Sequence, residues 1–121
     1  MAFEVSLQTV SVPGSADLST KQFLFGTINA SGQVAVVGAG LASDGVIALG
    51  PSAQARPCAL ASFPGQIARV MAGAAFANGA LLEADANGKA ITQSSGKILA
   101  KALAAAGAAG DIVPVLLILQ R

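Results

Sequence analysis

The sequence predicts a mainly β fold: a small single-domain β-barrel or β-sandwich with one short helix near the C-terminus. Turn-forming pairs such as Asn78-Gly79 and Asn87-Gly88 recur along the chain at intervals of roughly 8 to 20 residues, which suits short strands. Asn-Gly favours tight strand reversals because both residues tolerate a positive φ. A chain of 121 residues is expected to form one domain over residues 1–121.

The N-terminal segment is predicted to be extended. Phe3, Val5 and Leu7 alternate with polar residues, as in a half-buried strand. A Pro-Gly-Ser sequence at 13–15 sets residues 1–15 apart, so this segment is either an arm or an edge strand. Adding a strand to a partner's sheet is a common recognition mode, which makes the three apolar residues candidate partner contacts. An ordinary edge strand of the protein's own sheet explains the pattern equally well.

Eight further strands are expected between the turn signals. The last follows Asp111, and Pro114 within it indicates an edge position or a bulge, because proline donates no ladder hydrogen bond. The other seven are predicted at Phe23–Ile28, Gln33–Val37, Val46–Leu49, Cys58–Ser62, Gln66–Ala72, Ala80–Ala84 and Lys89–Thr92.

One helix is predicted, at residues 97–106. The stretch Lys97–Ala106 consists almost entirely of good helix formers. Ser94 or Ser95 is placed to cap its start, and Gly107 is placed to end it.

Composition argues for contacts with other proteins and against nucleic acid. Charged residues make up 11% of the chain, against about 25% in a typical globular protein. So few charges are expected to leave large uncharged patches on the surface, and such patches usually mark a contact with another subunit or partner. The net charge is +1 and the basic residues are scattered, without the clustering or the aromatic residues that nucleic-acid binding needs.

No membrane segment or export signal is expected. The apolar zone Ile98–Leu119 is interrupted by charged residues and a proline, so it does not suit a spanning helix of about 20 residues. The N-terminus carries Glu4 and lacks a basic region, unlike a signal peptide. Cys58 is the single cysteine, which excludes a disulfide within one chain and fits folding in a reducing cytoplasm.

Catalytic chemistry has few candidate residues, so we predict no enzyme, no cofactor and no metal. Histidine is absent, which removes the commonest general base and metal ligand. Cys58 is expected to be buried and inert, because a reactive thiol needs an electropositive, partly exposed setting. Glu83 and Asp85 would point the same way from one strand, but two carboxylates make an incomplete cation site and are expected to be solvated charges at a turn. Gly38-Ala39-Gly40 follows a strand, yet it lacks the helix and the third glycine of a dinucleotide fingerprint.

Four segments follow one another along the chain: ADLSTKQFLFGTIN (16–29), SDGVIALG (43–50), VMAGAAFANGALLEADANGKAI (70–91) and KALAAAGAAGDIVPVLLI (101–118). In this order they resemble the small capsid cement, or head decoration, proteins of tailed phages. The resemblance covers nearly the whole chain after residue 15, and its most distinctive part lies between Ala72 and Ala90. One departure is Ala100, where such proteins often have a glycine.

The resemblance implies a structural virion protein that binds the exterior of a capsid and stabilises the shell. It implies the major capsid protein as partner, and self-association as a homo-oligomer, with a trimer favoured over a dimer. Assembly would take place in the host cytoplasm. The main alternative is a cellular β-barrel module that binds a small ligand or serves as an enzyme subunit. A tail-tube or head–tail connector subunit is a further, weaker alternative.

Overall fold

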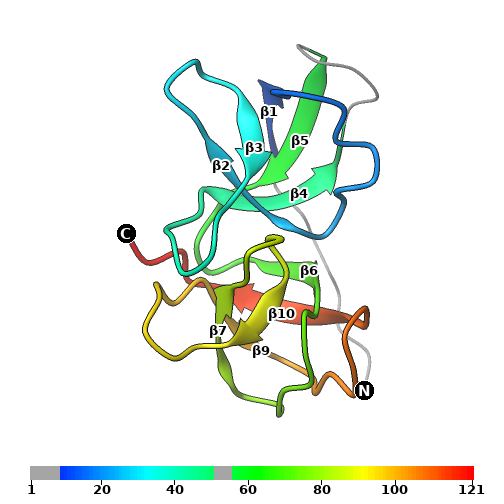
Figure 1. The fold of residues 1–121 in the computed structure, drawn as a ribbon, viewed down its shortest axis with the longest axis vertical. Helices are drawn as coiled ribbons and strands as arrows, with labels where there is room; N and C mark the ends of the chain where they lie inside the picture. The colour runs from blue at the N-terminus through cyan, green and yellow to red at the C-terminus, as the bar shows by residue number, and fades with distance from the viewer. Residues whose placement is uncertain (1–8, 51–55) are drawn as a thin grey trace.

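The described part of the chain forms two antiparallel sheets, each with five strands. This computed structural model describes residues 9–50 and 56–121. The sheets are stacked along the longest axis of the molecule, as Figure 1 shows. The first sheet contains β1 (Thr9–Pro13), β2 (Phe25–Ile28), β3 (Val34–Val36), β4 (Gly45–Leu49) and β5 (Pro57–Ala61), in the order β1-β5-β4-β2-β3. The second contains β6 (Ile67–Met71), β7 (Leu81–Ala84), β8 (Ala90–Thr92), β9 (Ala100–Ala102) and β10 (Ile112–Leu117), in the order β6-β10-β9-β7-β8.

The mainly β prediction is confirmed, but the helix predicted at residues 97–106 is wrong. The described part of the chain contains no helix, and the predicted region holds β9 instead. Ala100 and Ala102 are buried while Lys101 between them is exposed, which is the period-two pattern of a strand. β9 pairs with β10 on one side and β7 on the other. These pairings outweigh the intrinsic helix propensity of alanine and lysine, which is only a weak preference.

Each sheet closes on itself into a small barrel. In the first, Gly14 forms a parallel bridge with Val34, and the Ser15 N–H donates to the Val34 carbonyl at 2.8 Å. In the second, Ala72 bridges Ala90 in the same way, and the Gly73 N–H donates to the Ala90 carbonyl at 2.8 Å. Closure removes most of the free sheet edge that would otherwise pair with other chains. We refer to residues 9–50 and 56–61 as the first barrel and residues 67–117 as the second barrel.

The two barrels have the same strand order and form an internal structural repeat. The repeat extends to the tight turns that join β2 to β3 and β7 to β8. Asn29 Oδ1 accepts hydrogen bonds from the N–H groups of residues 31 and 33, both at 3.0 Å. Asp85 Oδ1 accepts the equivalent bonds from residues 87 and 89, at 2.8 and 2.9 Å. The glycines at the matching turn positions, Gly32 and Gly88, have φ angles of 74° and 77°.

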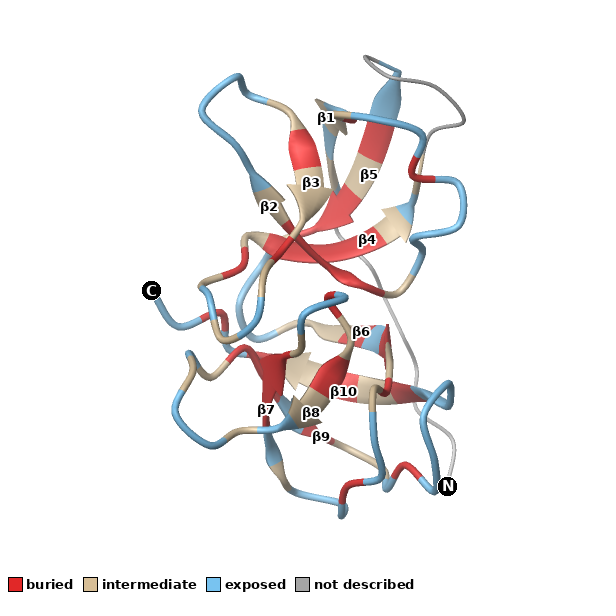
Figure 2. Ribbon diagram, in the orientation of Figure 1, coloured by how far each residue is buried: buried red, intermediate tan, exposed pale blue. Residues whose placement is uncertain are grey.

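The barrels share one of two hydrophobic clusters. The interior of the first barrel forms its own cluster, which includes Val34, Ile47 and Leu60. The second cluster fills the second barrel and extends across the junction between the barrels. As a result β2, β4 and β5 are buried on both faces only where they meet the second barrel, and Figure 2 shows these parts of the strands in red. The residues that the first barrel contributes to this second cluster are Phe25, Val37, Val46 and Ala61.

The predicted strands lie within one or two residues of the observed β2 to β8 and β10. Pro114 is nevertheless not at a sheet edge, because β10 lies between β6 and β9. Its carbonyl accepts from the Leu103 N–H at 3.0 Å, one residue past the end of β9. The backbone nitrogen of Pro114, which carries no hydrogen, therefore lies on the β9 side of β10, just beyond the last residue of β9. This arrangement explains how an internal strand tolerates proline.

The Asn-Gly turns behave in two different ways. Asn87-Gly88 joins the paired strands β7 and β8, as predicted for a hairpin. Gly79 also has a positive φ, 85°, but the strands on either side of it, β6 and β7, are not neighbours in the sheet. The positive φ was therefore predictable and the pairing was not.

The predicted N-terminal segment is described only in part. Residues 9–13 form β1, which pairs with β5. Phe3, Val5 and Leu7 lie outside the described residues, so their assignment as partner contacts stays a prediction. Among the described residues, no helix is long and apolar enough to cross a membrane.

Candidate functional site

A pocket of about 320 Å³ lies at the junction of the two barrels. The space exists because alanines, which have small side chains, occupy three of the lining positions, one each on β4, β5 and β6. Gln22 is fixed at one wall by a hydrogen bond from its Nε2 to the Ala48 carbonyl, at 2.9 Å. Arg69 is the one charged residue of the lining, and it is exposed. The lining residues are Gln22, Phe23, Val46, Ala48, Ala61, Ala68 and Arg69.

The side chains of this pocket are better suited to binding a small apolar ligand than to catalysing a reaction. General acid–base catalysis needs a positioned group that takes up and releases protons, and arginine stays protonated in proteins. The lining offers no carboxylate, thiol or amine beside that arginine. The pocket geometry therefore provides a cavity without catalytic groups.

Glu83 is buried, contrary to the expectation of a solvated turn charge. It lies on β7 and is only 5% exposed. Its Oε1 accepts from the Ser94 N–H at 2.8 Å and from the Ser94 hydroxyl at 3.0 Å. The burial was not predictable from sequence, because the residues that follow β8 return to cover this carboxylate only in the folded chain. Glu83 holds the β8–β9 connection in place.

Asp85 also has a structural role. Both bonds to its Oδ1 come from backbone N–H groups of the β7–β8 turn, at 2.8 and 2.9 Å. This Asx-type turn lies beyond the end of β7, so Asp85 and Glu83 bind different segments. Residues 9–50 and 56–121 contain no group of three or more acidic, Cys or His side chains that would suit a metal ion.

Cys58 is buried inside the first barrel, as predicted. Burial raises the pKa of its thiol, because the charged thiolate is poorly solvated there. A thiol with a raised pKa and no access to solvent is a poor nucleophile. Cys58 therefore contributes packing to the β5 side of the first barrel.

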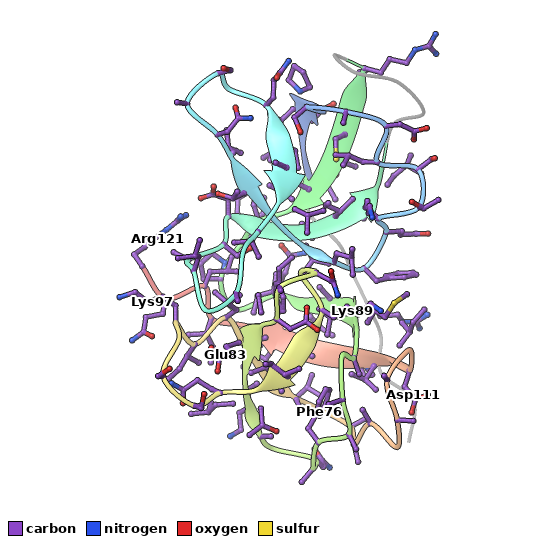
Figure 3. The ribbon with its side chains drawn as sticks, in the orientation of Figure 1. Phe76, Glu83, Lys89, Lys97, Asp111 and Arg121 are labelled. Atoms are coloured by element: carbon purple, nitrogen blue, oxygen red, sulfur yellow. The ribbon has the colours of Figure 1, made fainter. Side chains whose placement is uncertain are left out.

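The remaining charged residues are dispersed over the molecule. Figure 3 shows Lys97 and Arg121 at one side of the molecule and Asp111 at the opposite side. Asp111 Oδ2 accepts from the Gly107 N–H at 2.8 Å and so fixes its own loop. Arg121 forms an ion pair with Asp44 of the first barrel, which attaches the C-terminus to the β3–β4 connection.

Several large apolar side chains are exposed on this weakly charged surface. Leu49 is the most exposed, at 66%, followed by Leu41 at 60%. The others are Ile28, Phe63, Leu81, Ile112 and Ile118. Single exposed apolar residues are common on folded proteins, and only a contiguous group of them marks a contact surface.

Comparison with known proteins gives a match in structure but not in sequence. No family model and no curated protein matches the sequence. The crystal structure of the head fiber gp8.5 N base in bacteriophage phi29 matches with a TM-score of 0.72 and 15% sequence identity. The alignment covers 94% of this chain and 98% of that chain. This chain has the fold of that head fiber base.

The feature that sequence reasoning missed is the internal repeat. One local signal was available: Asn-Ala-Ser-Gly-Gln at 29–33 and Asp-Ala-Asn-Gly-Lys at 85–89 share small and turn-forming residues at the same spacing. The strands on either side of these turns differ in residue size, so the remainder of the repeat shows little sequence similarity.

Proposed function

We propose that the protein is a structural component of a phage virion that binds the outer surface of the capsid and stabilises the shell, without enzymatic activity. The observation that carries this proposal is the fold shared with a phage head fiber base over nearly the whole of both chains. The likeness to the head fiber base is a similarity of structure. The resemblance to capsid cement proteins rests on the order of segments in the sequence. The two lines of reasoning are independent of each other.

The described residues give this function its physical basis. Charged and polar side chains such as Glu83, Asp85 and Asp111 hold turns and connections, so they contribute rigidity. The exposed apolar residues offer small contact areas. Many weak contacts repeated over a lattice give strong overall binding through effective concentration. In this proposal the partners are the major capsid protein and further copies of the chain, with a trimer favoured over a dimer. The location is the capsid exterior, after assembly in the host cytoplasm.

The test is binding of the purified protein to capsids of the phage that encodes it, prepared without this protein. We expect saturable co-sedimentation with expanded capsids, and capsids that release their DNA at a higher temperature once decorated. Absence of saturable binding, or unchanged heat resistance at saturation, would reject the proposed function.

The predicted contact residues are tested in the same assay. Replacing Phe3, Val5 and Leu7 by serine should weaken capsid binding, because it removes the apolar face of the segment. The matched control replaces the interleaved polar residues Glu4 and Gln8 by serine and should leave binding unchanged. A truncation used for the same purpose must end before Thr9, since residues 9–13 form β1 of the first barrel. Equal binding by both variants would exclude the three residues as contacts while leaving the proposed function intact.

The junction pocket favours a second candidate function, the binding of a small apolar ligand. Its volume lies near the lower end of the range for ligand sites, about 300 Å³. The capsid experiment separates the two candidates, because a ligand-binding module has no reason to bind a capsid lattice saturably.

A further inference from the structure

The two barrels contact each other through a turn of the second barrel. The Phe25 N–H of the first barrel donates to the Gly88 carbonyl in the β7–β8 turn, at 2.8 Å. Gly88 is buried there, and a Cβ atom at this position would lie 2.5 Å from Val36 Cγ1 and 3.2 Å from the Phe25 carbonyl oxygen. In Figure 1 this yellow turn points from the second barrel into the first. The contact therefore depends on a glycine that inserts closely between β2 and β3.

The equivalent turn of the first barrel has no such contact within the chain. Gly32 corresponds to Gly88 and has nearly the same φ, but it is exposed. A Cβ at this position would meet no atom within 4 Å. Figure 1 shows the β2–β3 turn projecting from the far end of the molecule, away from the second barrel. The chain thus carries a second copy of its own docking turn, and this copy is free within the described structure.

The second barrel also carries an equivalent of the surface that receives the turn. Strand register places Leu81 at the position of Phe25 and Thr92 at the position of Val36. The Leu81 carbonyl accepts from Gln93 at 2.8 Å, just as the Phe25 carbonyl accepts from Val37 at 3.0 Å.

This second surface is not covered by the described part of the chain. Leu81 is 40% exposed whereas Phe25 is fully buried, and Thr92 is exposed. Phe25 donates to a turn carbonyl, but no turn among residues 9–50 and 56–121 accepts from the Leu81 N–H. We name residues 80, 81 and 92 the Leu81 surface.

We propose that the Asn29–Gln33 turn of one copy docks on the Leu81 surface of a second copy. The contact repeats between molecules the one that the chain makes within itself: the Gly32 carbonyl accepts from the Leu81 N–H, and the glycine packs against Thr92. The interface is heterologous, because the turn and the surface are different patches on opposite barrels. Such contacts build a ring when the rotation between copies closes and a filament when it does not. The inference rests on the internal repeat and does not require capsid binding.

At two equivalent positions the barrels carry different residues, and both differences make the contact between copies weaker than the contact within the chain. Lys101 stands on β9 where Val46 stands on β4, so the neighbouring surface is partly charged. Pro13 stands at the position of Met71, whose N–H donates to the Phe23 carbonyl at 2.9 Å. Proline has no N–H to replace this bond. The turn therefore carries most of the contact, and association needs a high local concentration.

The test is self-association of the purified protein, measured by sedimentation velocity and light scattering between roughly 10 and 500 µM, a range that resolves weak interfaces. The wild type should form species larger than one copy as its concentration rises. Gly32→Asn should stay monomeric, because asparagine tolerates a positive φ in the free turn but blocks close insertion. Leu81→Glu should stay monomeric because it places a charge in the docking surface. Leu49→Glu is the matched control: it removes an equally apolar, exposed residue of the first barrel and should associate like the wild type.

Mixing the two monomeric variants gives the sharpest result. The Gly32→Asn chain keeps its Leu81 surface, and the Leu81→Glu chain keeps its turn, so a mixture should form a complex of two chains and stop there. Thermal unfolding of each variant shows that its fold is retained. A wild type that remains monomeric over the whole range, variants that associate like the wild type, or a mixture without a two-chain complex would each overturn the proposal. None of these results depends on a capsid, so they leave the proposed function to its own test.

Discussion

The two barrels share one backbone plan but distribute side-chain volume in opposite ways. In the first barrel, β2 carries Gly26, and the space beside it is filled by large neighbours: a Cβ at this position would lie 3.1 to 3.3 Å from their side chains. In the second barrel, the matching position of β7 is Leu82, which is fully buried. The neighbours of Gly26 are Val34, Ile47 and Leu60, and their register equivalents in the second barrel are Ala90, Ala102 and Val115.

The first barrel thus has a small residue that faces large ones, and the second barrel has a large residue that faces smaller ones at the equivalent positions. Cores tolerate such exchanges when the total volume is conserved. The exchange explains why two equivalent barrels have little sequence in common at their cores. It also explains why the repeat is visible at the turns, where φ angles and hydrogen bonds rather than volume restrict the choice of residue.

The outer faces of the barrels differ for another reason. Phe25 and Val46 are buried because the second barrel covers them, whereas their equivalents Leu81 and Lys101 are exposed. Shared strand order therefore does not give shared burial. A residue's position in the stack of barrels decides whether its strand is buried on one face or on two.

The largest expected effect comes from removing the large residue of the second barrel. Leu82→Ala should lower the free energy of unfolding by about 2 to 5 kcal/mol, because it leaves a cavity among small neighbours that cannot move to fill it. Leu60→Ala is the matched change in the first barrel and should have a cost in the same range. Urea denaturation followed by circular dichroism measures both.

The shape of these transitions tests how far the barrels depend on each other. Because four residues of the first barrel belong to the core cluster of the second, we expect one transition that shifts as a whole in both variants. Two separate transitions, with each variant shifting only one of them, would show that the barrels unfold independently and would contradict the prediction of a single domain.

The second prediction compares the two turn glycines. Gly88→Asn should lower the free energy of unfolding by about 1 to 3 kcal/mol, because the new side chain meets Val36 and the Phe25 carbonyl within the chain. Gly32→Asn should change it by no more than about 0.5 kcal/mol, since the space around that turn is open. Both glycines have φ near 75°, so backbone strain is the same in the two variants and the difference isolates packing. Equal losses in thermal unfolding would show that the buried turn is not held by close packing.

Much of the strand pattern could be predicted from the sequence, because turn residues act locally. The order of the strands could not, since it depends on pairings between distant segments. Residues 97–106 show the limit clearly: their helix propensity is real, but Ala100 and Ala102 gain more by pairing with β7 and β10. Glu83 shows the same limit for a candidate site residue, because its partner Ser94 reaches it only after β8 has paired. The sequence predicted an inert Cys58 because burial follows from its apolar surroundings.

The smallest expected effect concerns a carboxylate that exists in only one barrel. Asp44 precedes β4, and its counterpart before β9 is the buried Leu99; both donate their N–H to the equivalent residue of β2 or β7. Burial acts to raise the pKa of Asp44. The hydrogen bonds from the Ile28 N–H, Arg121 and the Thr27 hydroxyl, together with the arginine charge, outweigh it and hold the pKa below its ordinary value.

A carboxylate with a lowered pKa stabilises the folded state at pH values above its unfolded pKa of about 3.9, and this stabilisation is lost as the pH falls through the folded pKa. Asp44→Asn should therefore lower stability at pH 7, by less than about 1 kcal/mol because its partner Arg121 is largely exposed. The variant should also lose less stability than the wild type between about pH 5 and pH 2. Unfolding curves measured across this range decide the point. Parallel curves for the two proteins would show that the ion pair with Arg121 and the hydrogen bonds from Thr27 and Ile28 do not favour the charged form of Asp44.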